Sequence, residues 1–247
     1  MWERSVRWSG CCNSVPSPIA DCGLAIADYT TQTHPRVAVD AVLFSISAGV
    51  LQTLLVKIKK GPRAGRWAFP GGLVQLGESL DNAARRELYE KTGVQDLYLE
   101  QLYTFGDARR DPVAHTVAVA YFALVPDPGR TLRRGEKYAD IGWFSVRGLP
   151  QLAYDHNAIA AYALQRLQAK LGYTNIVYSL LPREFTLAEI QEIYEVILDR
   201  RLDRRNFRRK ILALGLLKPL QKTRRGAHRP ATLYTFTRRS PMNVEVL

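Results

Sequence analysis

Hydrophobic and polar positions alternate through much of residues 36–146 in the way that is typical of β-strands. Runs rich in β-branched and aromatic residues, each bounded by turn residues, predict strands at 37–47, 51–57, 98–105, 116–125 and 141–144. A helical pattern interrupts them at residues 79–91, where Leu80, Ala84 and Leu88 recur on one face. This order predicts a mixed sheet with helices packed against it.

A second helical pattern covers residues 157–172, and a domain boundary is predicted at 173–182. The apolar stripe of this helix consists of Ile159, Tyr162, Ala163, Leu167 and Leu171. Gly172 follows the stripe directly and is a typical stop signal for a helix.

Two more helices are predicted after this boundary, separated by only a few residues. Thr186 and Glu189 have the spacing of a capping box, and Phe185 with Ile190 has that of a hydrophobic staple. The helix that they begin has an apolar stripe of Ile190, Ile193, Tyr194, Ile197 and Leu198. Asp203 is the predicted N-cap of the next helix, which runs to about residue 214 and buries Phe207, Ile211 and Leu214.

The outward face of this last helix is basic, and a basic hairpin follows it. Arg205 and Arg209 point away from the buried stripe, and the rest of the outward face is formed by Arg204, Asn206 and Arg208. Strands at 216–220 and 232–236 enclose a tip that carries Lys222, Arg224, Arg225, His228 and Arg229. This arrangement predicts a winged helix-turn-helix bound to double-stranded DNA. RNA is the weaker alternative, because the basic surface lacks the aromatic residues on which single strands stack.

The distribution of charge supports a nucleic-acid partner. The chain has a net charge of +12, and residues 173–247 carry 15 Lys and Arg against 7 Asp and Glu. Residues 200–229 hold 12 basic residues and one acidic residue, Asp203. A solvated face is the usual explanation for a basic run, but so high a density of one sign points to phosphate backbones.

Length, apolar content and cysteine usage favour a cytoplasmic protein of two domains. The 247 residues are 47% hydrophobic, no apolar run is long enough to span a membrane, and no signal peptide is apparent. Cys11, Cys12 and Cys22 are an odd number in a short segment, which indicates reduced thiols. Residues 1–35 are predicted to be a loosely ordered extension.

The helix at 79–91 and the residues around it form the most specific pattern in the chain. It reads Gly72-x5-Glu78-x7-Arg86-Glu87-Leu88-x-Glu90-Lys91-x-Gly93-Val94. Glu87 and Glu90 project from one side of the helix, as ligands of Mg²⁺ would. Lys91 lies on the same side, where its ammonium can pair with Glu87 and repel a cation, so we expect Mg²⁺ binding to be weak or absent. An ordinary surface helix of mixed charge is the alternative to a functional motif.

This spacing resembles the signature of the Nudix family, whose members hydrolyse nucleoside diphosphates linked to another group. Lys91 stands where that signature has the last of three clustered glutamates. The resemblance implies a nucleotide-recognising α/β/α sandwich over residues 36–172 whose metal site is altered, with Glu78 and Arg86 supporting the loop as an ion pair. The expected ligand-binding residues are Arg66, Phe69, Gly71, Gly72, Glu87, Glu90, Lys91 and Phe105.

Three other ionisable residues receive weaker interpretations. His115 and His156 have no catalytic context in the sequence, and a structural or surface role is expected for both. Glu136 is expected to be a solvated loop residue, although some Nudix hydrolases place a base on a late loop.

Phe69 and Phe105 fit the core of the domain as well as they fit a nucleotide pocket.

Three further strings make the resemblance narrower. They are LLPREFTLAEI at 180–190, LDRRNFRRKIL at 202–212 and RGAHRPA at 225–231. Together with the Nudix-like domain they resemble the Nudix-related transcriptional regulators of NAD metabolism (NrtR) over about residues 36–237. The resemblance implies an α+β protein, a Nudix sandwich followed by a winged helix-turn-helix at residues 173–247. It also implies a homodimeric repressor that binds a near-palindromic operator, senses ADP-ribose or a related nucleotide, and requires no cofactor.

Two alternatives stay open beside this interpretation. One is a working Mg²⁺-dependent ADP-ribose pyrophosphatase with an accessory nucleic-acid-binding domain, and the other is a sugar-responsive regulator with the same two domains. Lys91 favours a sensor over an enzyme because it replaces a metal ligand with a positive charge. Glu87 and Glu90 leave weak residual hydrolysis open.

Overall fold

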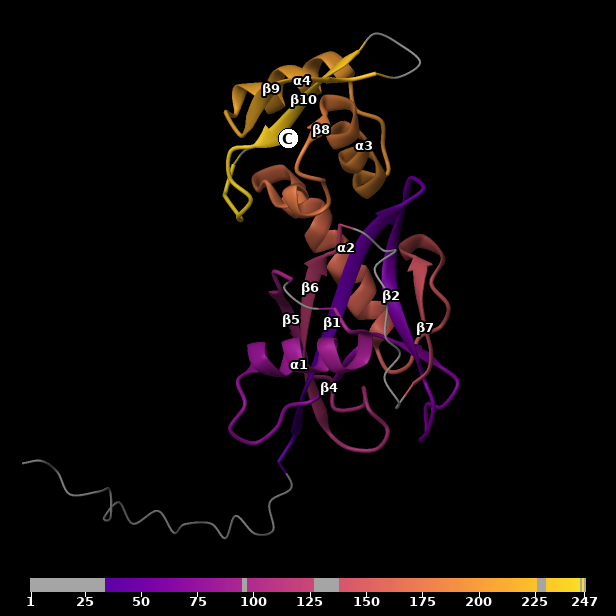
Figure 1. Ribbon diagram of the computed structural model, residues 1–247. Coiled ribbons are helices and arrows are strands. Elements are labelled where there is room, and N and C mark those ends of the chain that lie inside the picture. The colour runs from indigo at the N-terminus through magenta and orange to yellow at the C-terminus, as the bar shows by residue number, and fades with distance from the viewer. Residues whose placement is uncertain (1–33, 95–96, 127–137, 226–229, 245, 247) are drawn as a thin grey trace, which may run out of the picture. The chain divides into compact units, whose positions relative to one another are not determined.

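The computed structural model describes residues 34–94, 97–126, 138–225, 230–244 and 246 (Figure 1). The chain divides into a unit of residues 1–34 and a unit of residues 35–247, and every element described belongs to the second unit. The expected loose extension up to residue 33 lies outside the described residues, and so do the three cysteines, Glu136, His228 and Arg229.

The described part of residues 35–145 is built on a mixed seven-stranded sheet, as the sequence predicted (Figure 1). Its strands are β1 (Arg36–Ser47), β2 (Val50–Ile58), β3 (Trp67–Ala68), β4 (Gly71–Leu73), β5 (Glu100–Phe105), β6 (Thr116–Leu124) and β7 (Tyr138–Ser145). The order is β3-β2-β1-β6-β5, with β4 paired to β1 and β7 paired to β2. β1 and β6 run parallel, whereas β1 and β2 are antiparallel. The sequence missed β3 and β4, because two or three residues are too few to show a period of two.

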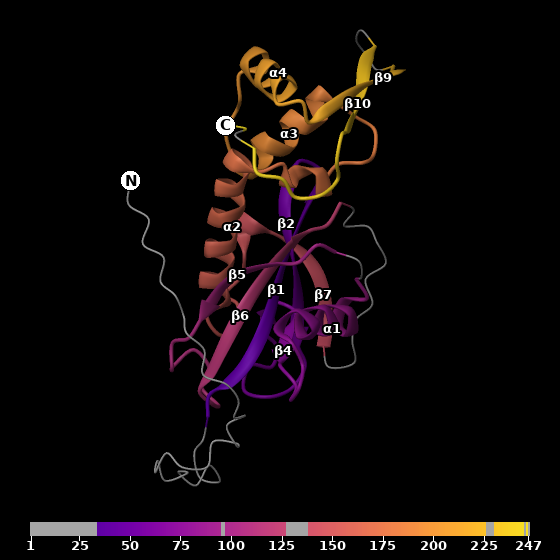
Figure 2. The ribbon, with the colours of Figure 1, turned by 90° about the vertical axis from the view of Figure 1, so that its left-hand side faces the viewer.

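Two helices cover opposite faces of this sheet (Figure 2). They are α1 (Leu80–Thr92) and α2 (His156–Tyr173). Because successive residues of a strand face opposite sides, β1 contributes to both layers. Val39 and Leu43 pack with residues of α1, whereas Val42 and Phe44 pack with residues of α2. The result is the α/β/α sandwich that the resemblance implied.

Local signals set the ends of α1. The hydroxyl of Ser79 accepts a hydrogen bond from the Asn82 backbone amide at 3.3 Å, which satisfies one free donor of the first turn. Gly93 closes the helix with a φ of 73° and donates its amide to the Tyr89 carbonyl at 2.8 Å. The left-handed φ explains why glycine stands at this position. The helix agrees with the predicted range of 79–91 to within one residue.

The described residues from 174 onward form the predicted winged helix-turn-helix (Figure 1). Its elements are a 3-10 turn (Ile176–Ser179), β8 (Phe185–Thr186), α3 (Leu187–Leu198), α4 (Arg204–Ala213), β9 (Leu217–Arg224) and β10 (Ala231–Phe236). The predicted capping box is present, since Thr186 and Glu189 each accept the other's backbone amide. Asp203 caps α4 by accepting from the Asn206 amide at 2.8 Å. The small sheet has the order β8-β10-β9.

A segment after β10 returns to the end of α2, which the sequence did not indicate. Val246 is 1% exposed, and its amide donates to the Gly172 carbonyl at 2.8 Å. Arg239 donates to the carbonyls of Tyr178 and Leu181, each at 2.6 Å. These contacts join the segment after β10 to the last turn of α2 and to the connection that follows it.

Candidate ligand pocket and nucleic-acid interface

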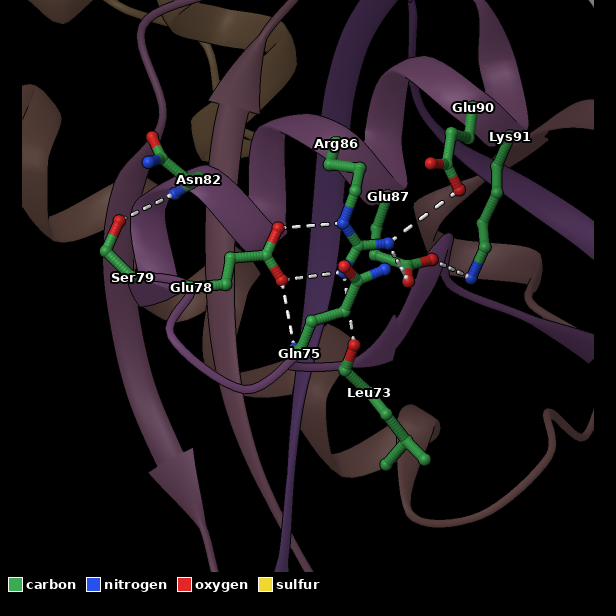
Figure 3. Close-up of polar contacts among 9 residues, drawn as sticks. All are labelled: Leu73, Gln75, Glu78, Ser79, Asn82, Arg86, Glu87, Glu90 and Lys91. Atoms are coloured by element: carbon green, nitrogen blue, oxygen red, sulfur yellow. Dashed lines mark hydrogen bonds and ion pairs between the residues drawn. The ribbon is translucent and has the colours of Figure 1, made fainter.

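An ion-pair network holds the loop before α1 against the helix (Figure 3). The Arg86 guanidinium donates to both carboxylate oxygens of Glu78, at 2.7 and 2.8 Å, and also to the Leu73 carbonyl at 3.2 Å. Glu78 accepts the Gln75 amide as well, at 3.0 Å. Arg86 first, and then this amide, lower the pKa of Glu78 to about 2. Glu78 and Arg86 therefore form the ion pair that the sequence predicted, and it fixes the loop.

Lys91 pairs with Glu87 inside the domain. Its Nζ lies 2.5 Å from Glu87 Oε2, and the two side chains are only 8% and 9% exposed (Figure 3). The ammonium also lies 5.4 Å from the centre of the Tyr138 ring. Burial acts to lower the pKa of Lys91, but Tyr138 and Glu87 raise it more, so this pKa lies above its ordinary value. Lys91 is therefore a charged side chain at neutral pH, as its spacing from Glu87 suggested.

This arrangement does not fit the Mg²⁺ site of a Nudix hydrolase. Glu87 lies between two cations, since its other oxygen accepts from Arg86 at 2.7 Å. The Glu90 side chain is half exposed and lies 3.7 Å from the same Arg86 nitrogen. Within the described residues, no group of three or more His, Cys, Asp or Glu side chains is placed to hold a metal ion. Glu87 and Glu90, the weak metal ligands expected from the sequence, are instead engaged with Arg86 and Lys91.

A pocket of about 1030 Å³ opens beside β1, β4 and the start of α2. It is lined by Arg36, Ala38, Asp40, Ile58, Lys59, Lys60, Ala68, Phe69, Gly71, Gly72, Leu73, Arg110, Asp111, Val113, Thr116, Tyr138, Tyr154 and His156. Arg36, Lys59 and Lys60 are exposed. These three cations give the pocket a basic rim, which suits an anionic ligand such as a diphosphate.

The structure places only some of the expected ligand-binding residues at this pocket. Phe69, Gly71 and Gly72 line it, whereas Glu87, Glu90 and Lys91 do not. Two others, Phe105 and Arg66, were also expected to bind the ligand. Phe105 packs against Tyr103 and Tyr162, with ring centres 5.3 and 6.1 Å away, and Arg66 lies near Gln151. Both lie outside the lining because the fold turns them toward other partners.

The two glycines at the pocket are required by the side chains packed against them. A Cβ at Gly71 would lie 2.2 Å from Asp40 Oδ1, and a Cβ at Gly72 would lie 2.4 Å from the Glu87 carboxylate. Any larger residue would collide with these atoms. The sequence had attributed Gly71 and Gly72 to the approach of a ligand, and the close packing of β1 and α1 is a second, independent reason.

The floor of the pocket is a buried charged cluster that the sequence did not reveal. Arg110 is bound by Asp155 through two hydrogen bonds of 2.7 and 3.0 Å, and its guanidinium lies 3.6 Å from Asp40. His156 accepts the Phe69 amide through Nδ1 at 2.9 Å and places Nε2 3.5 Å from Asp40. Burial lowers the pKa of His156, although Asp40 acts to raise it, so the ring is neutral at pH 7. The sequence contained one indication of this cluster, namely the charged Asp40 in the otherwise apolar run that forms β1.

The basic face of α4 is open. Phe207 and Ile211 are buried against the rest of the domain. Arg204, Arg205, Asn206, Arg208 and Arg209 are all exposed, as the helical spacing predicted. Arg209 and Asn206 are joined by a hydrogen bond of 3.1 Å. A helix with this surface can enter a major groove and present several donors to base edges and phosphates.

The wing differs from the expectation in one respect. Arg224 was expected to be free for DNA, but it pairs with Glu189 at 2.6 Å and also donates to the Glu184 carbonyl. Lys222 pairs with Glu184 at 2.7 Å. These contacts hold β9 to the start of α3, and they arise because the folded hairpin lies beside the capping box. Arg225 is exposed.

α2 connects the pocket to the helix-turn-helix. Its first residue, His156, lines the pocket, and its N-cap, Asp155, binds the pocket residue Arg110. Near its other end, Gln168 donates to the Ile197 carbonyl of α3 at 2.9 Å. Arg147, just after β7, pairs with Asp199 at the end of α3. The pocket and the DNA-facing helices thus share one rigid element.

Two family models match the chain. The NUDIX domain model covers residues 34–167, and the model of the NrtR DNA-binding winged helix domain covers residues 177–236. The chain is 36% identical over 219 residues to the ADPR responsive transcriptional repressor NtrR of Acinetobacter baylyi. The aligned region covers 85% of this chain and 86% of that protein.

Two solved structures of Shewanella oneidensis NrtR are also similar. The crystal structure with a 27mer DNA has a TM-score of 0.71 at 34% identity, covering 81% of this chain and 93% of that one. The structure of its NUDIX domain with ADP ribose has a TM-score of 0.52 at 35% identity, covering 58% of this chain and 96% of that one.

In the described residues of the present chain, no helix is both long and apolar enough to cross a membrane.

Proposed function

The chain belongs to the NUDIX family and carries an NrtR DNA-binding winged helix domain, and we propose that it is a repressor of NAD-metabolism genes that ADP-ribose releases from DNA. The observation that carries this proposal is the position of α2, which begins at the pocket floor and contacts the helix-turn-helix near its other end. A ligand that moves the start of α2 therefore acts on the DNA-facing helices. The repressor of Acinetobacter baylyi, named for its response to ADPR, supports the choice of effector.

The exposed basic face of α4 supports the DNA-binding half of the proposal. A single helix of this size reads only a few base pairs. We infer that two copies of the chain bind together, each placing α4 in one major groove. The operator is then near-palindromic, with half-sites separated by about one helical turn or a multiple of it.

The basic rim of the pocket supports the effector half. ADP-ribose carries a diphosphate between two riboses, and Arg36, Lys59 and Lys60 offer cations at the mouth. His156 and Phe69 line the same pocket and are buried. The ligand is thus proposed to bind with its diphosphate toward the rim.

The Nudix helix supports a sensor in preference to a hydrolase. Glu87 forms ion pairs with both Arg86 and Lys91. The Glu90 side chain is half exposed and lies near Arg86. A hydrolase of this family needs convergent carboxylates around a metal ion beside the diphosphate. We propose that this chain binds the nucleotide without cleaving it at an ordinary enzymatic rate.

The test is a titration of the whole protein with DNA and ADP-ribose. An operator-like duplex is first selected from random-sequence DNA, and its affinity is measured by fluorescence anisotropy with and without saturating ADP-ribose. We expect ADP-ribose to weaken DNA binding by roughly 5–150-fold, the usual range of coupling between two sites. Because coupling is reciprocal, calorimetry should show DNA weakening ADP-ribose binding by the same factor. Equal ADP-ribose affinities with and without DNA would refute this effector.

A matched pair of variants tests the role of α2. Gln168→Ala removes the hydrogen bond to Ile197, which contributes about 1 kcal/mol, and should reduce the coupling factor about fivefold. Gln165→Ala changes an exposed residue on the same helix and should leave the coupling unchanged. If both variants behave alike, the signal does not pass through the contact between α2 and α3.

A further inference from the structure

Asp40 is a carboxylate that the fold holds at the bottom of the pocket. It lies within β1 and its side chain is 8% exposed. Gly71 of β4 packs so closely on Oδ1 that a Cβ there would lie 2.2 Å away. The Asp40 carboxylate therefore lies against β4, in space that a side chain at position 71 would otherwise occupy. Its other oxygen, Oδ2, makes no hydrogen bond with any described residue.

The neighbours of Asp40 do not supply the missing hydrogen bond. Arg110 gives its two short hydrogen bonds to Asp155 and reaches Asp40 Oδ2 only at 3.6 Å. His156 uses Nδ1 to accept the Phe69 amide, so its single proton is on Nε2, and this nitrogen lies 3.5 Å from the same oxygen. The floor thus holds two carboxylates and one guanidinium. A buried carboxylate oxygen in this situation is stabilised by any neutral donor that reaches it.

We propose that Asp40 accepts a hydrogen bond from a ribose hydroxyl of the nucleotide whose diphosphate binds at the basic rim. This inference rests on the proposed function, because it takes the effector to be ADP-ribose. The distribution of charge in the pocket supports this inference. Arg36, Lys59 and Lys60 favour an anionic ligand at the rim, whereas Asp40 Oδ2 at the floor is an acceptor without a hydrogen bond to any described residue. A ligand that is anionic in its middle and carries hydroxyls at its ends satisfies both requirements.

The same geometry makes Asp40 a specificity-determining residue. A carboxylate accepts from a hydroxyl but repels a phosphate, so a nucleotide phosphorylated on the hydroxyl that Asp40 contacts should be rejected. Ribose hydroxyls occur on both sides of the diphosphate in ADP-ribose. The arms of the experiment distinguish the adenosine ribose from the terminal ribose.

The experiment compares wild-type protein with Asp40→Asn by calorimetry, using ADP-ribose, ADP and inorganic pyrophosphate. We expect Asp40→Asn to weaken ADP-ribose binding roughly 10–150-fold, the usual loss for a hydrogen bond to a charged group. Pyrophosphate binding should not change. An equal loss for ADP assigns the contact to the adenosine ribose, and an unchanged ADP affinity assigns it to the terminal ribose. A loss shared by all three ligands, or no loss for ADP-ribose, would overturn the proposal.

Asp107→Asn is the matched control, because Asp107 is an exposed carboxylate of the same domain that lies outside the lining of the pocket. It accepts the Arg109 amide at 2.7 Å. This variant should change ADP-ribose affinity by no more than about threefold, within the usual effect of substitutions away from direct contacts.

Thermal unfolding without ligand separates this proposal from the proposed function. If wild-type protein binds no ADP-ribose, the effector is wrong, but the role of Asp40 is still decided by stability. A carboxylate whose role is to bind a ligand contributes little to the stability of the ligand-free protein. Asp40→Asn should therefore leave Tm unchanged or raise it. A Tm lowered by several degrees would mean that Asp40 only supports Arg110 and His156, and would overturn the inference.

Discussion

Replacing Lys91 by glutamate tests whether this one side chain turns the Nudix helix from a metal site into a sensor. The side chains of Lys91 and Glu87 are 8% and 9% exposed, and their charged groups lie 2.5 Å apart. Breaking a buried ion pair of this kind costs about 3–5 kcal/mol. Arg86 still pairs with Glu87 at 2.7 Å, which favours the lower part of that range. The new carboxylate adds repulsion, which favours the upper part.

The expected result for Lys91→Glu is a large loss of stability that Mg²⁺ partly restores. In a chain of this size each kcal/mol changes Tm by about 2–4 °C, so the fall in Tm should be roughly 6–20 °C. The new carboxylate lies on the same side of α1 as Glu87 and Glu90, and three such groups suit Mg²⁺. Mg²⁺ at about 100 times its Kd would then return about 2.7 kcal/mol.

The assay is thermal unfolding of wild type, Lys91→Glu and Lys91→Met with and without Mg²⁺. Lys91→Met keeps a long side chain but adds no carboxylate, so it should lose stability without gaining a response to Mg²⁺. The reasoning is refuted if Mg²⁺ stabilises the wild type as much as Lys91→Glu, or if Lys91→Glu unfolds at the wild-type temperature. A wild-type turnover of ADP-ribose of roughly 1 per second or more would independently contradict the assignment as a sensor.

Three further predictions concern the DNA-binding domain and the pocket floor. Arg205→Ala or Arg209→Ala, whichever side chain reads a guanine, should weaken operator binding by about 1–3 kcal/mol. Titrations against operator variants should then show relaxed specificity at one base pair. Unchanged affinity for both variants would mean that another element reads the DNA. Arg224→Ala frees Glu189 and should weaken binding to all DNA sequences. A salt slope reduced by about one unit would indicate an additional phosphate contact, and unchanged affinity would contradict any role of Arg224 in the wing. His156 has a lowered pKa, so its unfolded form takes up a proton first, and stability should fall as the pH drops below about 6.5. Urea unfolding at pH 5.5 and 7.5 should show a smaller fall for His156→Asn, and equal falls would contradict this.

The features that the sequence predicted well are those set by neighbouring residues. α1 and the capping box of α3 agree with the prediction because caps and helical periodicity involve residues three or four positions apart. The contact of Lys91 with Glu87 follows from the same spacing. The exposed Arg205 and Arg209 follow from the apolar stripe on the opposite side of α4.

The residues at the pocket were less predictable, because strand register and loop path bring them together. Arg110, in the loop between β5 and β6, and Asp155, at the start of α2, are 45 positions apart, and Asp40 comes from β1. Phe105 belongs to a pattern that fits a pocket and a core equally well, and the fold placed it against Tyr162. Neither arrangement is visible in a linear pattern.

The sequence by itself determined the order of the longer strands and helices, the altered Nudix helix and the basic helix-turn-helix, because short-range spacing and charge define each of them. Only the tertiary structure decided which charges are free to bind a ligand or DNA. Arg224 is paired with Glu189 across 35 positions, whereas Asp40 has an oxygen without a hydrogen bond to any described residue. The physical reason is that a charged group's pairing and burial depend on neighbours that folding brings together, which residues near it in the chain do not specify.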